Sequence, residues 1–200
     1  MTTQIDFYYS LQSPWTFMAW PRIEALEHAA NVDIAPYLVD LPTLFSQTGG
    51  QPLAKRGKQR QDYRMAELKR WSRRLGINVT LTPAHFPVDE SLAACCALVM
   101  RDDGGPVLPF SHACLRAVWQ EERDLADAGT VRALLQQVNA DADAVLERAR
   151  AETVATRRLA ETQRAIDAGV FGVPSFVIDG EVFWGQDRLD FVEEAVALGA

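Results

Sequence analysis

Near its start the chain reads Ile5-Asp6-Phe7-Tyr8-Tyr9-Ser10-Leu11-Gln12-Ser13-Pro14-Trp15-Thr16. The first five residues are typical of a buried strand, and apolar residues then recur at helical spacing, as Phe17, Trp20, Ile23 and Leu26. Pro14 suits the first turn of a helix, where a missing N–H group costs nothing. The stretch therefore predicts a strand that leads into a helix, with Ser13 at the helix N-terminus.

Ser13 has two interpretations at this position. A serine before the first turn is often only an N-cap, whose side-chain oxygen accepts a backbone hydrogen bond. The same place also offers unpaired N–H groups and the positive end of the helix dipole, which together stabilise an anion. A thiolate brought by a ligand would be such an anion.

A second informative stretch lies far along the chain. It reads Gly169-Val170-Phe171-Gly172-Val173-Pro174-Ser175-Phe176-Val177-Ile178-Asp179-Gly180. The pattern indicates a helix end, a tight turn and a short apolar strand that enters a hairpin at Asp179-Gly180. Pro174 then lies at the entry to that strand, where an ordinary edge proline is also tolerated.

Three blocks, in order along the chain, carry a resemblance to a known family. They are Phe7 to Trp15, the middle block His85-Phe86-Pro87-Val88-Asp89, and Gly169 to Pro174 together with Phe183-Trp184-Gly185-Gln186-Asp187-Arg188-Leu189. The chain resembles the 2-hydroxychromene-2-carboxylate isomerase family, which is related to kappa-class glutathione transferases and more distantly to DsbA-like oxidoreductases. The last block is the most specific of the three.

The resemblance implies a thioredoxin-like fold in which glutathione is the cofactor. Related oxidoreductases carry Cys-x-x-Cys where this chain has Ser13-Pro14-Trp15-Thr16, so disulfide exchange is excluded. By resemblance, Ser13 is the catalytic residue and stabilises the thiolate of glutathione, and the bond before Pro174 is cis. The glutathione-binding residues implied are Pro14, Trp15, Arg60, Val173, Pro174, Gln186 and Asp187.

Two of these assignments also have a physical basis. The backbone of Val173 can hold the cysteinyl part of glutathione as an added strand would. Gln186 and Asp187 precede the last predicted helix, where N–H groups suit a carboxylate and the Asp187 side chain suits an ammonium group. A plain N-cap is the alternative for this pair.

The chain departs from its relatives after residue 44. Family members often show Phe-Lys-x-Thr-Gly-Asn, whereas this sequence has Phe45-Ser46-Gln47-Thr48-Gly49-Gly50. Two polar contacts to glutathione are therefore expected to be missing. The basic run that begins at Lys55 is either a solvated helix face or part of an anion site, and by resemblance Arg60 belongs to that site.

Composition indicates one soluble domain. The 200 residues are 48% hydrophobic and 24% charged, which suffices for a single sizeable core. The net charge of −7 argues against a nucleic-acid partner, and the start of the chain shows no signal peptide or membrane span. A cytoplasmic protein is expected.

The three cysteines, Cys95, Cys96 and Cys114, have no metal-binding or redox spacing and are expected to be buried, so no metal site is predicted.

The order of elements predicts an α/β, thioredoxin-like fold of the βαβ…ββα type with a large all-helical insertion. Expected strands are 5–9, 33–39, 175–179 and 181–184, which form a four-stranded sheet. Expected helices are 14–30, 58–75, 90–102, 108–127, 130–138, 142–168 and 187–198. Residues 1–200 are expected to form one structural unit, with a thioredoxin-like part at 1–42 and 169–200 and the insertion at 43–168.

The function implied is a glutathione-dependent isomerisation of a 2-hydroxychromene-2-carboxylate-type aromatic acid. Glutathione thiolate would add to a conjugated carbon, the ring would open, and bond rotation with loss of glutathione would yield a trans-o-hydroxybenzylidenepyruvate type of product. Alternatives are a kappa-like glutathione transferase or peroxidase and a non-catalytic binding module. A serine hydrolase is excluded because no histidine belongs to a recognisable triad.

The partners expected are therefore an aromatic carboxylate as substrate and, since relatives are dimers, a second copy of the chain. The predicted substrate pocket is apolar. Its expected lining is Trp15, Phe45, Trp71, Phe86 and Trp184, although each of these is as readily explained as a core residue.

Overall fold

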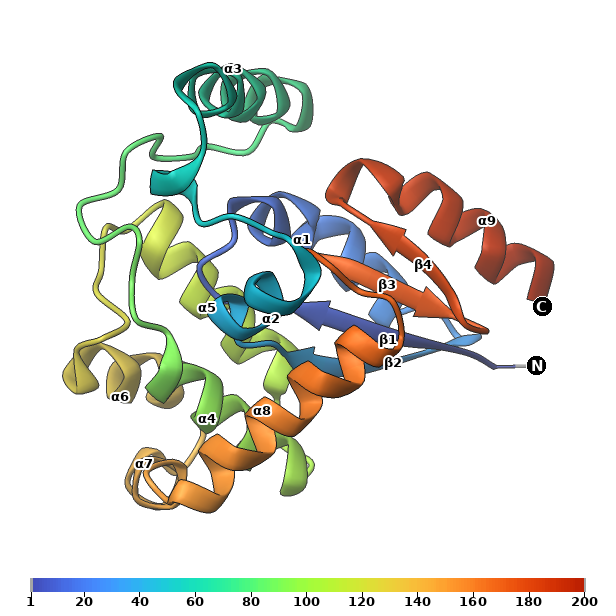
Figure 1. Cartoon of the computed structure of the whole chain (residues 1–200). Helices are drawn as coiled ribbons and strands as arrows, with labels where there is room; N and C mark the ends of the chain where they lie inside the picture. Colours follow the sequence, from blue (N-terminus) through green and yellow to red (C-terminus); the bar gives the residue numbers. More distant parts are fainter. Residues whose placement is uncertain (1, 200) are drawn as a thin grey trace.

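The computed structural model of the chain describes residues 2–199. Its centre is a sheet in the order β2-β1-β3-β4, which the two ends of the chain build together (Figure 1). The parallel pair β1 and β2 is joined through a helix, whereas β3 pairs antiparallel with both β1 and β4. This confirms the expected α/β class and the four-stranded sheet. The strands are β1 Thr3–Tyr9, β2 Val32–Leu38, β3 Ser175–Ile178 and β4 Glu181–Trp184.

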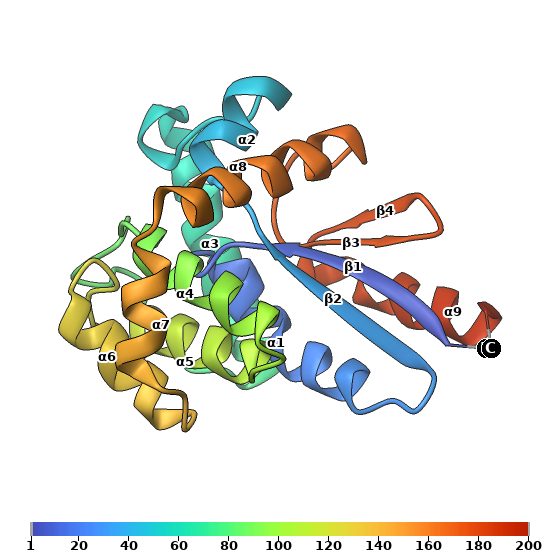
Figure 2. The same ribbon diagram turned by 90° about the horizontal axis from the view of Figure 1, so that it is seen from below.

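Helices cover both faces of the sheet (Figure 2). Helices α1 (Pro14–Glu27) and α9 (Leu189–Gly199) lie on one face, and α8 (Glu152–Asp167), with α2 (Leu41–Thr48) packed against it, lies on the other. The segment between β2 and β3 supplies every helix from α2 to α8 in the described chain. The others are α3 Lys58–Leu75, α4 Ser91–Asp102, α5 Val107–Trp119, α6 Ala128–Gln137 and α7 Ala142–Ala149, with 3₁₀ turns η1 Leu53–Lys55 and η2 Gln186–Arg188.

Alternation along β1 divides the core into two parts. Because successive strand side chains point to opposite faces, Phe7 and Tyr9 enter the larger cluster under α1, while Tyr8 enters a smaller one under α8. The Phe7 ring stacks on Tyr9 at 4.4 Å and on Phe176 at 5.0 Å between ring centroids. The apolar run that predicted β1 is therefore buried on both faces.

Three expected helices differ from the structure. The helix expected at 14–30 ends at Glu27, and the one expected at 108–127 ends at Trp119, before a loop in which Glu122 has a φ of 52°. The helix expected at 142–168 is two helices, α7 and α8, separated at Ala151, whose backbone is extended. Alanine favours helix and no glycine or proline marks this turn, so the residue types do not reveal it.

The three cysteines are buried, as the sequence predicts. Cys95, Cys96 and Cys114 are buried free thiols, and burial raises the pKa of Cys96 to about 12. Between residues 2 and 199, no helix is both long and apolar enough to cross a membrane.

The packing of α4 yields a stability prediction. Leu98 is fully buried in the larger core cluster, so Leu98→Ala leaves a cavity and should lower the free energy of unfolding by about 2–5 kcal/mol. Leu198→Ala, at a residue that is 89% exposed, should change it by less than about 0.5 kcal/mol. Urea unfolding followed by circular dichroism measures both, and equal midpoints would contradict the burial described.

Candidate active site

Ser13 caps α1. The Ser13 Oγ accepts a hydrogen bond from the Thr16 N–H at 3.2 Å, and the Ser13 carbonyl accepts one from Phe17 at 3.0 Å. The cap interpretation is thus confirmed, but it uses only the oxygen lone pairs of the hydroxyl. Within residues 2–199, the Ser13 hydroxyl proton has no acceptor and the Trp15 N–H has no partner. Two donors at the positive end of a helix therefore stay available to an anion.

The stretch around Pro174 lies at the same end of the sheet. Tyr8 of β1 pairs with Ser175 of β3, so the residues before Ser175 lie beside the loop that follows β1. The bond between Val173 and Pro174 is cis. Neither the N–H nor the C=O of Val173 forms a hydrogen bond with any described residue. This segment therefore presents free backbone groups, as an unpaired strand edge does.

Gln186 and Asp187 reach the same region through β4. The Gly185 N–H donates to the Pro174 carbonyl at 2.9 Å, and the η2 turn that follows contacts α1. Gly185 is the N-cap of this turn, and Gln186 and Asp187 are its first two residues. Gln186 is buried, whereas Asp187 is exposed and its carboxylate pairs with Arg188 at 2.8 Å. The structure thus brings Ser13, Pro14 and Trp15 together with Val173-Pro174 and Gln186-Asp187.

Among residues 2–199, no side-chain hydrogen bond or ion pair joins Arg60 to this group. It lies on the exposed first turn of α3, and its guanidinium has no hydrogen bond or ion pair with residues 2–199. Nearby Tyr63 is 63% exposed.

The departure at Gly50 has a steric explanation. A Cβ atom at Gly50 would overlap the Phe45 ring, so the space of an asparagine side chain is occupied by an aromatic one. Ser46 is exposed, and its hydroxyl donates to the Thr43 carbonyl within α2 at 2.8 Å. Neither residue therefore replaces the polar contacts that the family pattern implies.

The aromatic residues expected to line one pocket lie in different surroundings. Phe86 packs against Trp119, with ring centroids 4.9 Å apart, whereas the Trp71 indole donates to Glu67 within α3. Trp184 is half exposed and packs on Phe171, beside the Val173-Pro174 turn. No described cavity joins all five rings.

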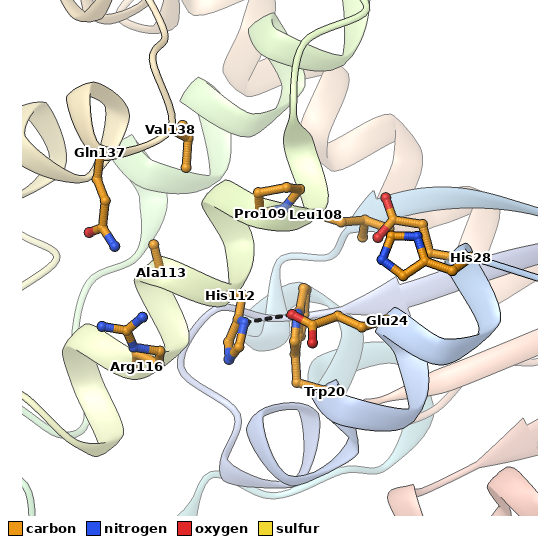
Figure 3. Close-up of a pocket in the computed structure, with 11 residues that line it drawn as sticks. Trp20, Glu24, His28, Leu108, Pro109, His112, Ala113, Arg116, Gln137 and Val138 are labelled. Carbon is orange, nitrogen blue, oxygen red and sulfur yellow. Dashed lines mark ion pairs between the residues drawn. The ribbon is translucent and has the colours of Figure 1, made fainter.

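A cavity of about 330 Å³ lies between α1 and α5 (Figure 3). It contains none of the predicted site residues, because it adjoins the C-terminal half of α1, away from Ser13. His112 lines it, pairing through Nδ1 with Glu24 at 2.9 Å and stacking on Trp20 at 5.3 Å. Burial lowers the pKa of His112, so at neutral pH this histidine serves packing rather than charge.

A buried ion pair beneath the Ser13 loop escaped the sequence analysis. The Glu90 carboxylate accepts hydrogen bonds from Ser10 Oγ and the Gln12 N–H, both at 2.9 Å, and from Arg158 at 3.1 Å. Arg158 also donates to the Val39 carbonyl at 3.0 Å. Burial raises the pKa of Glu90, while Arg158 and the two donors oppose that shift. No motif links residues 68 positions apart, so only folding reveals the pair.

Comparison with known proteins defines the class. Residues 4–197 match the DSBA-like thioredoxin domain family. The chain is 31% identical over 195 residues to a 2-hydroxychromene-2-carboxylate isomerase from Sphingobium xenophagum, covering 96% of this chain and 97% of that protein. A solved 2-hydroxychromene-2-carboxylate isomerase superposes with a TM-score of 0.84 at 24% identity, over 97% of this chain and 94% of that one.

A more distant structure shares the fold alone. The cytosolic disulfide reductase DsbM from Pseudomonas aeruginosa, solved with GSH, superposes with a TM-score of 0.70 at 15% identity, over 97% of this chain and 99% of that one.

The family model and the sequence identity together show that the chain belongs to the DSBA-like thioredoxin class and, within it, to the 2-hydroxychromene-2-carboxylate isomerase family. It is an isomerase.

The buried pair yields a prediction with a neighbouring control. Arg158→Met leaves the Glu90 carboxylate buried without its cation and should lower the free energy of unfolding by about 3–5 kcal/mol. Arg157→Met removes a cation that pairs with Asp102 at a site where both side chains are 40% exposed, and should cost about 0–1 kcal/mol. Chemical unfolding measures the free energy of unfolding of both variants. Similar losses for the two would show that the buried pair contributes no more to stability than the exposed pair.

Proposed function

We propose that the chain catalyses a glutathione-dependent cis–trans isomerisation of a 2-hydroxychromene-2-carboxylate-type aromatic acid. The observation that carries the proposal is the pair of unused donors at the start of α1, the Ser13 hydroxyl and the Trp15 N–H. Buried polar groups normally form hydrogen bonds. The fold itself gives no reason for the buried Ser13 hydroxyl proton to have no acceptor. A thiolate between these donors would satisfy both.

The residues around Ser13 fit a bound γ-glutamyl tripeptide. The free N–H and C=O of Val173 suit the backbone of a cysteinyl residue, which would bind as an added strand. Asp187 is exposed and can exchange Arg188 for the ammonium group of a ligand, because an exposed ion pair contributes little. Pro14 and Trp15 form the first turn between these groups. Arg60, free of partners and exposed, would supply a cation for a ligand carboxylate.

Bound glutathione would supply a thiolate for addition to an electron-poor conjugated carbon, with opening of the substrate's ring C–O bond, rotation about the adjacent bond and release of the unchanged thiol. Ser13 donates a hydrogen bond that favours the charged sulfur, and the N-terminus of α1 acts in the same direction, so both lower the thiol pKa. Thr16 has no thiol and cannot form a mixed disulfide with glutathione. The glutathione thiol would therefore be available again after each turnover. The Glu90–Arg158 pair holds the Ser10–Gln12 loop and with it the position of Ser13.

The reaction is tested by following the absorbance of a chromene carboxylate with and without glutathione. We expect conversion only when glutathione is present, and we expect free thiol to remain constant over many turnovers because the cofactor is regenerated. Conversion at the same rate without glutathione would show that glutathione is not the cofactor. Stoichiometric loss of thiol would instead identify a glutathione transferase.

The role of Ser13 is tested by two substitutions that separate capping from chemistry. Ser13→Ala removes the cap and the donor, and should cost about 1 kcal/mol in stability and most of kcat. Ser13→Gly keeps nearly all of the cap energy, to within a few tenths of a kcal/mol, yet should lose as much kcat as Ser13→Ala. If activity followed stability across the two variants, Ser13 would be a cap and nothing more.

A further inference from the structure

Arg64 is a partly buried cation without a counter-ion. Two other partly buried arginines are paired with acids: Arg22 with Asp190 and Glu193, and Arg101 with Glu161. In the described chain the only polar contact of the Arg64 guanidinium is with the sulfur of Met65, at 4.0 Å. Burial and the nearby Arg56 lower the Arg64 pKa to about 10, so the group is still charged at neutral pH. Burying a charge without a partner is unfavourable. An anionic ligand that paired with the Arg64 guanidinium would remove this cost.

The surroundings of Arg64 are cationic and aromatic. Arg56 lies close enough to Arg64 to depress its pKa, and Arg60 acts in the same way on Arg56. The guanidinium lies over the Phe86 ring at 5.2 Å and the Trp119 ring at 5.9 Å. Stacking on ring faces leaves the N–H groups at the guanidinium edge free to donate in pairs. Trp119 is fully buried, whereas Phe86 is partly exposed. A flat aromatic carboxylate matches these features, since its ring can pack beside Phe86 and its carboxylate can accept from the fork.

The place of Arg64 in the fold is consistent with a substrate site. Figure 3 shows α1 and α5 running in opposite directions, with His28 near Leu108 and Trp20 near His112. The C-terminal end of α5 therefore points toward the N-terminal end of α1. Helix α3, which carries Arg64, contacts α1, and both views place it at that end of α1 (Figures 1 and 2).

We propose that Arg64, stacked over Phe86 and Trp119, binds the carboxylate of the aromatic substrate and so orients its ring toward Ser13. The identity of the substrate class rests on the proposed isomerisation, whereas the binding of an aromatic carboxylate at Arg64 does not. The interaction is a bidentate, charge-assisted pair, formed in a partly desolvated site where it is stronger than at an open surface.

The experiment measures binding before it measures turnover. Chromone-2-carboxylate, a non-reacting analogue, and its carboxamide are titrated into the protein by calorimetry. We expect the protein to prefer the carboxylate. Arg64→Met should weaken carboxylate binding roughly ten- to hundred-fold and abolish the preference, because it removes hydrogen bonds to a charged group. Arg64→Lys, which keeps the charge but not the fork, should fall between the two. Arg73→Met, an exposed position on the same helix, is the matched control and should bind like the parent protein.

Stability and kinetics supply the second readout. Arg64→Met should keep or raise the melting temperature, because an unpaired, partly buried charge is lost; a large decrease would show that Arg64 supports the fold instead. In turnover assays the KM for the chromene carboxylate should rise while the KM for glutathione stays constant. A change confined to the glutathione KM would assign Arg64 to the cofactor and overturn the proposal, as would a parent protein with no preference for the carboxylate. Arg64-dependent binding in a protein without glutathione-dependent turnover would support the subsite and reject the proposed function.

Discussion

The buried pair between Glu90 and Arg158 is the interaction on which the candidate site depends. Glu90 starts α4, Arg158 lies in α8, and the pair binds the loop after β1 and the carbonyl at the end of β2. Both side chains are almost fully buried, so their charges can be tolerated only together. The helices between β2 and β3 are thereby tied to the sheet at the place where Ser13 begins α1.

Hydrogen-bonding groups are used very differently on the two sides of that loop. Beneath it, Ser10, Gln12 and Glu90 satisfy one another, which makes the loop rigid. Above it, the Ser13 proton and the Trp15 N–H have no partner among the described residues. A rigid support under unpaired donors is the arrangement that stabilises charge in a reaction, because the donors need no reorganisation when the charge forms.

Two regions near the candidate site differ in polarity. A Cβ atom at Gly50 would overlap the Phe45 ring, so the surroundings of Gly50 are aromatic. Arg56, just before α3, and Arg60 and Arg64 on α3 concentrate positive charge within a protein whose net charge is −7. Local positive charge in an acidic protein attracts an anionic ligand to that one region and leaves the rest of the surface unfavourable to it.

The sequence by itself determined the four strands, the cap at Ser13, the turn before Pro174 and the family, because each of these is encoded by residue types and their spacing along the chain. It did not reveal the break at Ala151, since alanine favours helix and no glycine or proline marks the turn. Nor did it single out Glu90, Arg158 or Arg64. Whether a charge is paired, buried or left without a partner depends on residues that are distant in the chain, and only the tertiary structure decides which of them meet.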